Sequence, residues 1–278
     1  KVIGVILPKI VHHFFSTVIM GIEEGANEKG YHIMVCFSNE SYKKEVETLK
    51  VLSNGSVDGL IVSIANETLK NKEFKHFTDL VSEEIPLVLF DRVVDEILCD
   101  KVVVDDLGAG YKATKHLLYN GRRKIALITT PKHVNVGLLR RQGYEKALIE
   151  NHIKTDNRII VEIDEKQDIK KQIETIFKND IDGVFAVNEI YAANAVKIAK
   201  DKGLKVPKDL SVIGFTDGLI SEYSSPSITT VAQHGFTMGK QAVELLLERI
   251  DKEAEVYSPK KIVISSDLKL RESTKPSS

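Results

Sequence analysis

The side chains that could do chemistry here are the polar and aromatic residues that follow the short apolar runs of the sequence. They include aromatic rings, carboxylates, one arginine and amides. Rings can stack on the apolar face of a small molecule, while arginine, carboxylate and amide groups hold its hydroxyls. We therefore expect a site for a small polyhydroxylated ligand, with the candidates Phe14, Phe15, Asp91, Asp105, Arg140, Asn188, Thr216, Asp217 and Gln233.

Metal and nucleophilic chemistry have little support in the sequence. His12 and His13 are adjacent, and neighbouring loop residues rarely reach one ion; no third ligand is spaced to join them. No G-x-S-x-G, H-E-x-x-H or Cys/His signature occurs. We expect no metal, no cofactor and no catalytic residues.

A loose dinucleotide fingerprint, Gly108-x-Gly110-x-x-Ala113, stands at a strand-to-helix turn. Asp105 and Asp106 precede it, where a pyrophosphate would meet like charge, and no suitable acidic residue ends a nearby strand. We interpret this stretch as the start of a helix.

Strands that alternate with helices must position the candidate residues, which predicts parallel sheets covered by helices. The expected strands are 2–7, 32–37, 59–63, 87–90, 101–104, 124–129, 159–163, 183–186, 211–214 and 228–231, and the expected helices are 15–29, 42–53, 108–120, 141–150, 169–178 and 191–202. Gly30, Gly121 and Gly203 follow helix ends, where left-handed caps are expected. In such sheets ligands bind beyond the carboxyl ends of the strands.

Three segments recur in the same order in both halves of the chain. "KVIGVILP" corresponds to "KIALITTP", "SVDGLIVS" to "DIDGVFAVN", and "IPLVLFD" to "DLSVIGFTD". Two unrelated α/β domains would also share apolar strands, but the matched order and spacing favour one design used twice. The sequence therefore predicts two similar lobes with a cleft between them.

Composition excludes several classes of protein. Among 278 residues, 39 Lys and Arg nearly cancel 40 Asp and Glu, which is unlike a free-standing nucleic-acid binder. The two cysteines lie far apart and fit a reduced cytoplasmic protein more simply than a single disulfide. No apolar run is long enough to span a bilayer, so we expect no membrane partner.

Segments along the whole chain resemble the lactose-repressor (LacI/GalR) family of transcription regulators. They are "GIEEGANEKGYHIMVCFSN", "VDGLIVS", "VVVDDLGAGYKATKHLLYNGRRKIALI", "RRQGYEKAL", "VPKDLSVIGFTDG", "SPSITTVAQ" and "LKLRES". The resemblance implies a type I periplasmic-binding-protein-like α/β fold with two doubly wound parallel-sheet lobes and three crossovers. The N-terminal lobe would contain 1–104 and 234–260, with a helix at 236–250. The C-terminal lobe would contain 105–233 and 261–278, with a last strand at 262–264.

The resemblance also implies roles for the candidate residues. Phe14 and Phe15 would flank the ligand from the N-terminal lobe, as cleft walls rather than core residues, with His12 and His13 in the loop that positions them. Polar contacts would come from Asp91, Asp105, Arg140, Asn188 and Gln233, with Arg140 reaching the effector from the C-terminal lobe.

This sequence departs from the family pattern in two places. Many members have an aspartate directly after "IGF", where this chain has Thr216 and then Asp217. Either Asp217 takes over with a shifted loop, or that contact is weakened. Val134 and Val136 stand where some relatives use polar contacts.

The family role is a cytoplasmic regulator whose core binds an effector and forms a homodimer. The chain opens on the first strand of this core, so we expect a core without its helix-turn-helix headpiece, and operator DNA as a partner of the full-length protein only. A mature periplasmic sugar-binding protein of an ABC transporter and a Rossmann-type enzyme are the alternatives. The first shares the fold, whereas the second predicts nucleotide binding, for which the sequence offers little.

Overall fold

The computed structural model describes residues 1–9, 13–251 and 258–274, and the chain divides into two compact units. Unit 1 contains residues 1–104 and 234–265, and unit 2 contains residues 105–233 and 266–278. The chain therefore passes between the units three times.

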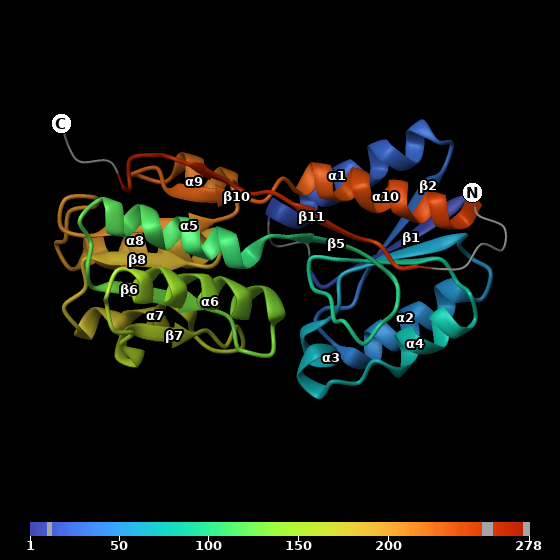
Figure 1. Ribbon diagram of the computed structural model, residues 1–278, viewed down its shortest axis with the longest axis horizontal. Helices are drawn as coiled ribbons and strands as arrows, with labels where there is room; N and C mark the ends of the chain where they lie inside the picture. Colours follow the sequence, from blue (N-terminus) through green and yellow to red (C-terminus); the bar gives the residue numbers. More distant parts are fainter. Residues whose placement is uncertain (10–12, 252–257, 275–278) are drawn as a thin grey trace. The chain divides into compact units, whose positions relative to one another are not determined.

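Unit 1, whose helices and strands are labelled in part in Figure 1, is built on a parallel six-stranded sheet. The strand order is β11-β5-β4-β3-β1-β2. Its strands are β1 (Val2–Leu7), β2 (His32–Phe37), β3 (Gly59–Val62), β4 (Leu87–Phe90), β5 (Asp100–Val104) and β11 (Lys261–Ile264). Its helices are α1 (His13–Glu28), α2 (Tyr42–Ser53), α3 (Asn66–Asn71), α4 (Lys75–Ser82) and α10 (Gly235–Asp251).

The core of unit 1 follows from the alternation of side chains along each strand. Val5 and Leu7 of β1 belong to the cluster on the side of α1 and α10. Ile6, between them, belongs to the cluster that contains Leu49 of α2 and Phe77 of α4. Both faces of the sheet are thus buried, which explains why its strands are almost continuously apolar.

Unit 2 repeats this design with the order β12-β10-β9-β8-β6-β7, in which only the β10–β12 pair is antiparallel. Its strands are β6 (Ile125–Thr129), β7 (Ile160–Glu162), β8 (Gly183–Ala186), β9 (Ser211–Phe215), β10 (Thr229–Ala232) and β12 (Asp267–Lys269). Its helices are α5 (Asp106–Tyr119), α6 (Asn135–Glu150), α7 (Ile169–Glu174), α8 (Glu189–Asp201) and α9 (Leu219–Tyr223).

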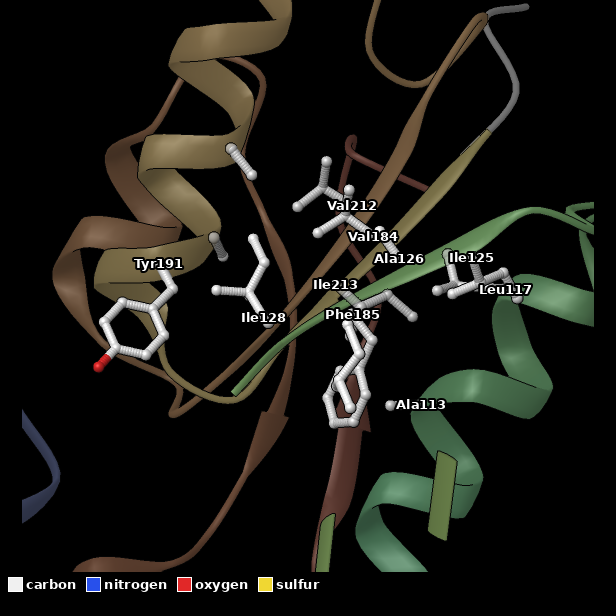
Figure 2. Packing of buried hydrophobic residues seen from close by; sticks show 14 of the residues in the cluster. Ala113, Leu117, Ile125, Ala126, Ile128, Val184, Phe185, Tyr191, Val212 and Ile213 are labelled. Carbon is white, nitrogen blue, oxygen red and sulfur yellow. The ribbon is translucent and has the colours of Figure 1, made fainter. Parts of the chain in front are cut away.

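The core of unit 2 is one cluster of buried side chains. Figure 2 shows the ring of Phe185 pointing toward Ala113 of α5, while Ile128 lies on the side of α8, near Tyr191. All four side chains are almost completely buried. Burial on both faces again accounts for the apolar strands.

The predicted two-fold use of one α/β design is confirmed by the matching strand orders. The expected strands lie within about two residues of the observed ones, and Gly30, Gly121 and Gly203 have φ of +72°, +82° and +77° as predicted for left-handed caps. The short elements α3, α4, α9 and β12 were not predicted.

Two boundary predictions are wrong. The last predicted strand, 262–264, was expected in the C-terminal lobe, but β11 pairs with β5 in unit 1 and the third crossover follows Ser265. Helix α6 begins at Asn135, six residues before the expected start. The prediction missed this start because the N-cap residue, Val134, makes no side-chain capping hydrogen bond. Arg140 therefore lies within α6, not in the loop before it.

In each unit one pair of helices packs so closely that glycine is required. In unit 1, a Cβ on Gly21 of α1 would lie 2.0 Å from the carbonyl oxygen of Phe236, and one on Gly239 of α10 would lie 2.2 Å from that of Val18. Backbone cannot yield as a flexible side chain can, so these glycines set the distance between α1 and α10.

The α5–α6 pair of unit 2 has the same construction. A Cβ on Gly110 would lie 2.2 Å from the carbonyl oxygen of Arg140, and one on Gly143 would lie 2.1 Å from that of Leu107. Gly110 thus has a packing role, and its helix starts in the DLGAG stretch, as the interpretation of the loose dinucleotide fingerprint required.

Replacing Gly21 by Ala should lower the free energy of unfolding by about 1–3 kcal/mol, because the added methyl forces α1 and α10 apart. Gly25→Ala is the matched control, because its Cβ would make only ordinary contact, at 3.4 Å from Val243. That variant should unfold at the same or a slightly higher urea concentration, since Ala favours helix over Gly by about 1 kcal/mol. Equal destabilisation of the two variants would contradict the packing argument.

Candidate functional site

The two phenylalanines of the predicted site are core residues of unit 1. They lie in the first turn of α1, with 6% and 3% of their surfaces exposed. The ring of Phe15 packs edge-on against Phe90, with centroids 6.3 Å apart, and against Phe14 at 5.3 Å. The expectation that they are not core residues is therefore wrong, and His13 belongs to the helix instead of a loop. His12 lies outside the described residues. That Phe14 and Phe15 contact a ligand stays a prediction.

Asp91 directly follows β4 at the carboxyl edge of the sheet of unit 1. It is 7% exposed and has a φ of +59°, and its N–H donates to the carbonyl oxygen of Val102 at 3.0 Å. The neighbouring Arg92 binds both carboxylate oxygens of Glu40, at 2.7 and 3.0 Å. Burial acts to raise the pKa of Glu40, whereas the charge and hydrogen bonds of Arg92 act to lower it. The lowering effects outweigh burial, so the pKa of Glu40 lies below its usual value. A charged, hydrogen-bonded edge results.

Thr216 has the same place and geometry in unit 2. It follows β9, has a φ of +79°, and its N–H donates to the carbonyl oxygen of Val231 at 2.9 Å. A left-handed backbone is uncommon for any residue other than glycine and is a marked outlier for a β-branched one. The Thr216 hydroxyl donates to Oε1 of the buried Gln233 at 2.8 Å. The structure thus brings Thr216 and Gln233 together at the carboxyl edge.

Arg140 is the most extensively held of the predicted residues. Although 6% exposed, its guanidinium donates from Nε to Oδ1 of Asp106 at 2.7 Å and from Nη1 to the carbonyl oxygen of Val187 at 2.8 Å. Its Cζ lies 3.7 Å from the ring centroid of Phe215. Nη2 has no hydrogen-bond partner among the described side chains and backbone groups. A fixed guanidinium with one free donor nitrogen is suited to binding a ligand oxygen.

The equivalent position in unit 1 carries no charge. By their places in the two close helix pairs, Val18 corresponds to Arg140, and Gly235, the first residue of α10, corresponds to Asp106, the first residue of α5. Phe90 corresponds to Phe215, which lies under the guanidinium. The helix pair therefore packs in the same way without an ion pair. Packing alone does not explain why unit 2 buries two charges there.

Asp106 bears the energetic consequence of that burial. Desolvation raises the pKa of its carboxyl, and the neighbouring Arg140 offsets only part of this effect. Breaking such a pair by removing one partner is strongly destabilising, because an uncompensated charge remains buried. The sequence reasoning missed Asp106 as a site residue because Asp105, beside it, was the residue nominated.

Asp105 and Asn188 cap helices with the oxygens that were expected to bind ligand. Oδ1 of Asp105 accepts from the N–H of Gly108 at 2.9 Å, and Oδ1 of Asn188 accepts from that of Tyr191 at 2.8 Å. Capping fixes both side chains at the carboxyl edge of unit 2, at the starts of α5 and α8. Among the described residues, the nitrogen of the Asn188 side chain has no hydrogen-bond partner. Their contact with a ligand stays a prediction.

Asp217 is engaged by the end of the chain. Its Oδ1 accepts from Arg271 at 2.5 Å and from the hydroxyl of Thr230 at 3.1 Å. A shifted loop that turns Asp217 toward the position of Thr216 would have to break both contacts. That Asp217 or Thr216 contacts a ligand stays a prediction.

Two polar atoms that sequence reasoning overlooked are buried at the same edge. Oγ1 of Thr130, just after β6, and Oδ1 of Asn135, at the start of α6, have no hydrogen-bond partner within the described part of the chain. Buried polar atoms are usually paired, and a missing partner calls for an explanation. Both residues are polar and follow β6 in the sequence, as the other candidates follow their strands, so the same rule could have identified them.

Other chemistry is weakly represented. Within residues 1–9, 13–251 and 258–274, no three His, Cys, Asp or Glu side chains gather as metal ligands would. Cys36 and Cys99 are free thiols, and burial raises the pKa of Cys99 to about 12, so it is a poor nucleophile. No described helix is long and apolar enough to cross a membrane.

Comparison with known proteins shows the family and the fold of the chain. Residues 114–274 match the periplasmic binding protein-like domain family. The chain is 30% identical to the HTH-type transcriptional regulator DegA of Bacillus subtilis, over 99% of its own length and 81% of the relative. It is 33% identical to the HTH-type transcriptional repressor PurR of Aliivibrio fischeri, over 92% of the chain and 76% of the relative.

The chain belongs to the LacI family of transcriptional regulators. Its fold matches a LacI family transcriptional regulator from Enterococcus faecium, solved with bound ribose, with a TM-score of 0.84, 28% identity and complete coverage of both chains. The predicted family and periplasmic-binding-protein-like fold are thereby confirmed. These relatives are named as regulators and not as enzymes or transport proteins.

Replacing Arg140 by Val, the residue type that unit 1 has at the corresponding position 18, should lower the free energy of unfolding by about 3 kcal/mol, because the buried Asp106 loses its partner. The double variant Arg140→Val/Asp106→Gly reproduces the unit 1 pair and should recover most of this loss. Urea unfolding of both variants measures the difference. A double variant as unstable as the single one would show that the ion pair is needed for folding.

The deficit of Arg140→Val should depend on pH. A carboxyl with a raised pKa in the folded protein favours the folded state in acid, and this advantage is lost as pH rises above the unfolded value of about 3.9. Without Arg140, nothing offsets the charge that Asp106 acquires. The stability of Arg140→Val relative to wild type should therefore fall as the pH rises from about 4 to 7. Urea unfolding at several pH values measures this change. A deficit that does not vary with pH would exclude Asp106 as its source.

Proposed function

We propose that this chain is the effector-sensing and dimerisation core of a cytoplasmic LacI-type regulator. Its ligand would be a small polar molecule of the sugar class, held jointly by residues of both units. The observation that carries the proposal is the guanidinium of Arg140, which is buried, fixed on three sides and left with one free donor. The matching helix pair of unit 1 has no such group.

The groups around Arg140 suit a hydroxylated ligand. Thr216 and Gln233 form a polar pair, Asn188 keeps an amide nitrogen, and Thr130 and Asn135 present oxygens without partners. Such a site offers both donors and acceptors, as sugar hydroxyls require. In unit 1, Asp91 would add a carboxylate and Phe14 an apolar surface. The ribose bound by the Enterococcus faecium relative supports this ligand class.

The regulatory role follows from linkage. A ligand shifts an equilibrium between two arrangements only by its difference in affinity for them. A ligand that contacts both units favours the arrangement in which both sets of contacts are made. We propose that this shift controls DNA binding by a helix-turn-helix segment, as the names of the relatives DegA and PurR suggest.

A panel of pentoses, hexoses and disaccharides should contain a compound that raises the unfolding temperature of the protein. A ligand at 100 times its Kd adds about 2.7 kcal/mol of stability.

Calorimetric titration should then show that Arg140→Val/Asp106→Gly binds the selected sugar at least tenfold more weakly, because a charge-assisted hydrogen bond is lost. Phe14→Ala should weaken binding by about 1–3 kcal/mol through lost ring contact. Unchanged affinity in the Arg140 variant would refute the assignment.

The homodimer is proposed from the exposed apolar side of α9. Leu219, Ile220 and Tyr223 of this helix are 59%, 43% and 77% exposed. Aromatic and aliphatic side chains grouped in this way are typical of contact surfaces between proteins. A second copy of the chain is the partner that the family role requires.

Tyr223→Glu should weaken dimerisation at least tenfold, because a charge would be buried in an apolar contact. Sedimentation velocity over a range of concentrations measures the change. Tyr119→Glu is the control, since that tyrosine is 90% exposed at the end of α5. A wild-type protein that stays monomeric at every concentration would refute the dimer, and an unchanged Tyr223→Glu dimer would exclude α9 as the contact.

A further inference from the structure

Unit 2 has a cavity of about 420 Å³ at the amino edge of its sheet, opposite the edge that carries Arg140. The start of β6, residues 179–180 before β8, the second half of α6 and the segment 153–159 form its walls. Its apolar lining comes from Ile125, Leu148, Ile153, Ile159 and the ring of Tyr144. The Tyr144 hydroxyl is already used, since it donates to the carbonyl oxygen of Ile125 at 2.7 Å. Tyr144, Ile125 and Leu148 are at most 2% exposed, so the apolar surface that a ligand can reach comes mainly from the partly exposed Ile153.

The rim of this cavity has an excess of positive charge. It carries Arg123, Lys124, Lys154 and Arg158 but only two carboxylates, Asp156 and Asp180. Asp180 pairs with Lys124, and Asp156 pairs with Arg158 at 2.8 Å. The hydrogen bonds from Arg158 hold the pKa of Asp156 below its usual value, so that carboxylate is committed to its partner.

Two cations remain after this pairing. Among the described residues, Lys154 has no carboxylate partner, and Arg123 donates from Nη1 only to the backbone carbonyls of Leu118 and Arg122. The cavity of similar volume in unit 1 differs, because its four acidic residues outnumber its three lysines. The two cavities thus have similar volumes but opposite balances of charge in their linings.

We infer that the unit 2 cavity is a second ligand site, which binds a small organic phosphate monoester. The dianion would be neutralised at the rim by Lys154 and Arg123, and its ring or chain would lie against the partly exposed Ile153. The size lies within the range of small-molecule sites. The site is independent of the proposed effector site, although Arg140 and Tyr144 lie one turn apart on α6.

Phenyl phosphate is the probe that tests this inference, because it joins a dianion to a ring. Calorimetric titration should show one saturable site that binds phenyl phosphate at least tenfold more tightly than inorganic phosphate or benzyl alcohol. Lys154→Gln should weaken binding about tenfold, because one charged hydrogen-bonding partner is lost. Lys154→Arg should restore binding, and Lys197→Gln, an exposed lysine of α8 outside the cavity, should leave it unchanged.

The variant Arg140→Val/Asp106→Gly separates this site from the proposed effector site. It should bind phenyl phosphate as the wild type does, while Lys154→Gln should bind the selected sugar as the wild type does. Three results would overturn the inference: no saturable binding of phenyl phosphate, equal affinity in Lys154→Gln, or loss of binding in the Arg140 variant. The last result would mean that the anion occupies the effector site instead.

Discussion

The buried guanidinium of Arg140 is the constraint around which the carboxyl edge of unit 2 is organised. Arg140 is only 6% exposed, and burying a charge is very unfavourable unless it is paired and hydrogen-bonded. Asp106 supplies the countercharge, Val187 a carbonyl and Phe215 an aromatic face. These groups come from α5 and from the ends of β8 and β9, so the helix pair and the sheet must both be in register before the charge can be buried.

Comparison of the two units separates what the fold needs from what the site needs. Both units use the same strand order and the same close, glycine-mediated helix pair. In unit 2 this pair carries Arg140 and Asp106 where the described residues of unit 1 have Val18 and Gly235. Since Val18 and Gly235 serve equally well in unit 1, the ion pair is an addition to a scaffold that is stable without it. Such an addition is costly to bury, and perturbed buried charges of this kind cluster at functional sites.

The sequence predicted the scaffold well because burial on both faces makes parallel strands almost continuously apolar. It also placed Asp91, Asn188 and Thr216 just after strands β4, β8 and β9, where the structure has them, while their contact with a ligand stays a prediction. It failed for α3 and α4, which are six and eight residues long, too short for a clear helical period. The placement of β11 also failed, because the pairing of β11 with β5 joins residues about 160 positions apart, which no local pattern encodes.

The side-chain partners in the site were beyond the reach of sequence for a related reason. "DD" after a strand does not reveal that Asp105 caps α5 while Asp106 meets a residue of α6. Likewise, "IGFTD" does not reveal that Asp217 is held by Arg271 near the end of the chain. Both outcomes depend on contacts between distant segments, whereas the choice of residue type is visible locally.

The left-handed residue after β4 and β9 shows how backbone and chemistry can vary independently. Asp91 and Thr216 share a positive φ and the same N–H to carbonyl hydrogen bond to the neighbouring strand, although one is acidic and the other neutral. Aspartate tolerates this conformation, whereas a β-branched residue is strained there by about 1–3 kcal/mol. The backbone geometry thus belongs to the repeated scaffold and persists despite the strain. The side chain that it displays differs between the units: Asp91 carries a carboxylate, whereas Thr216 carries a neutral hydroxyl that donates to Gln233.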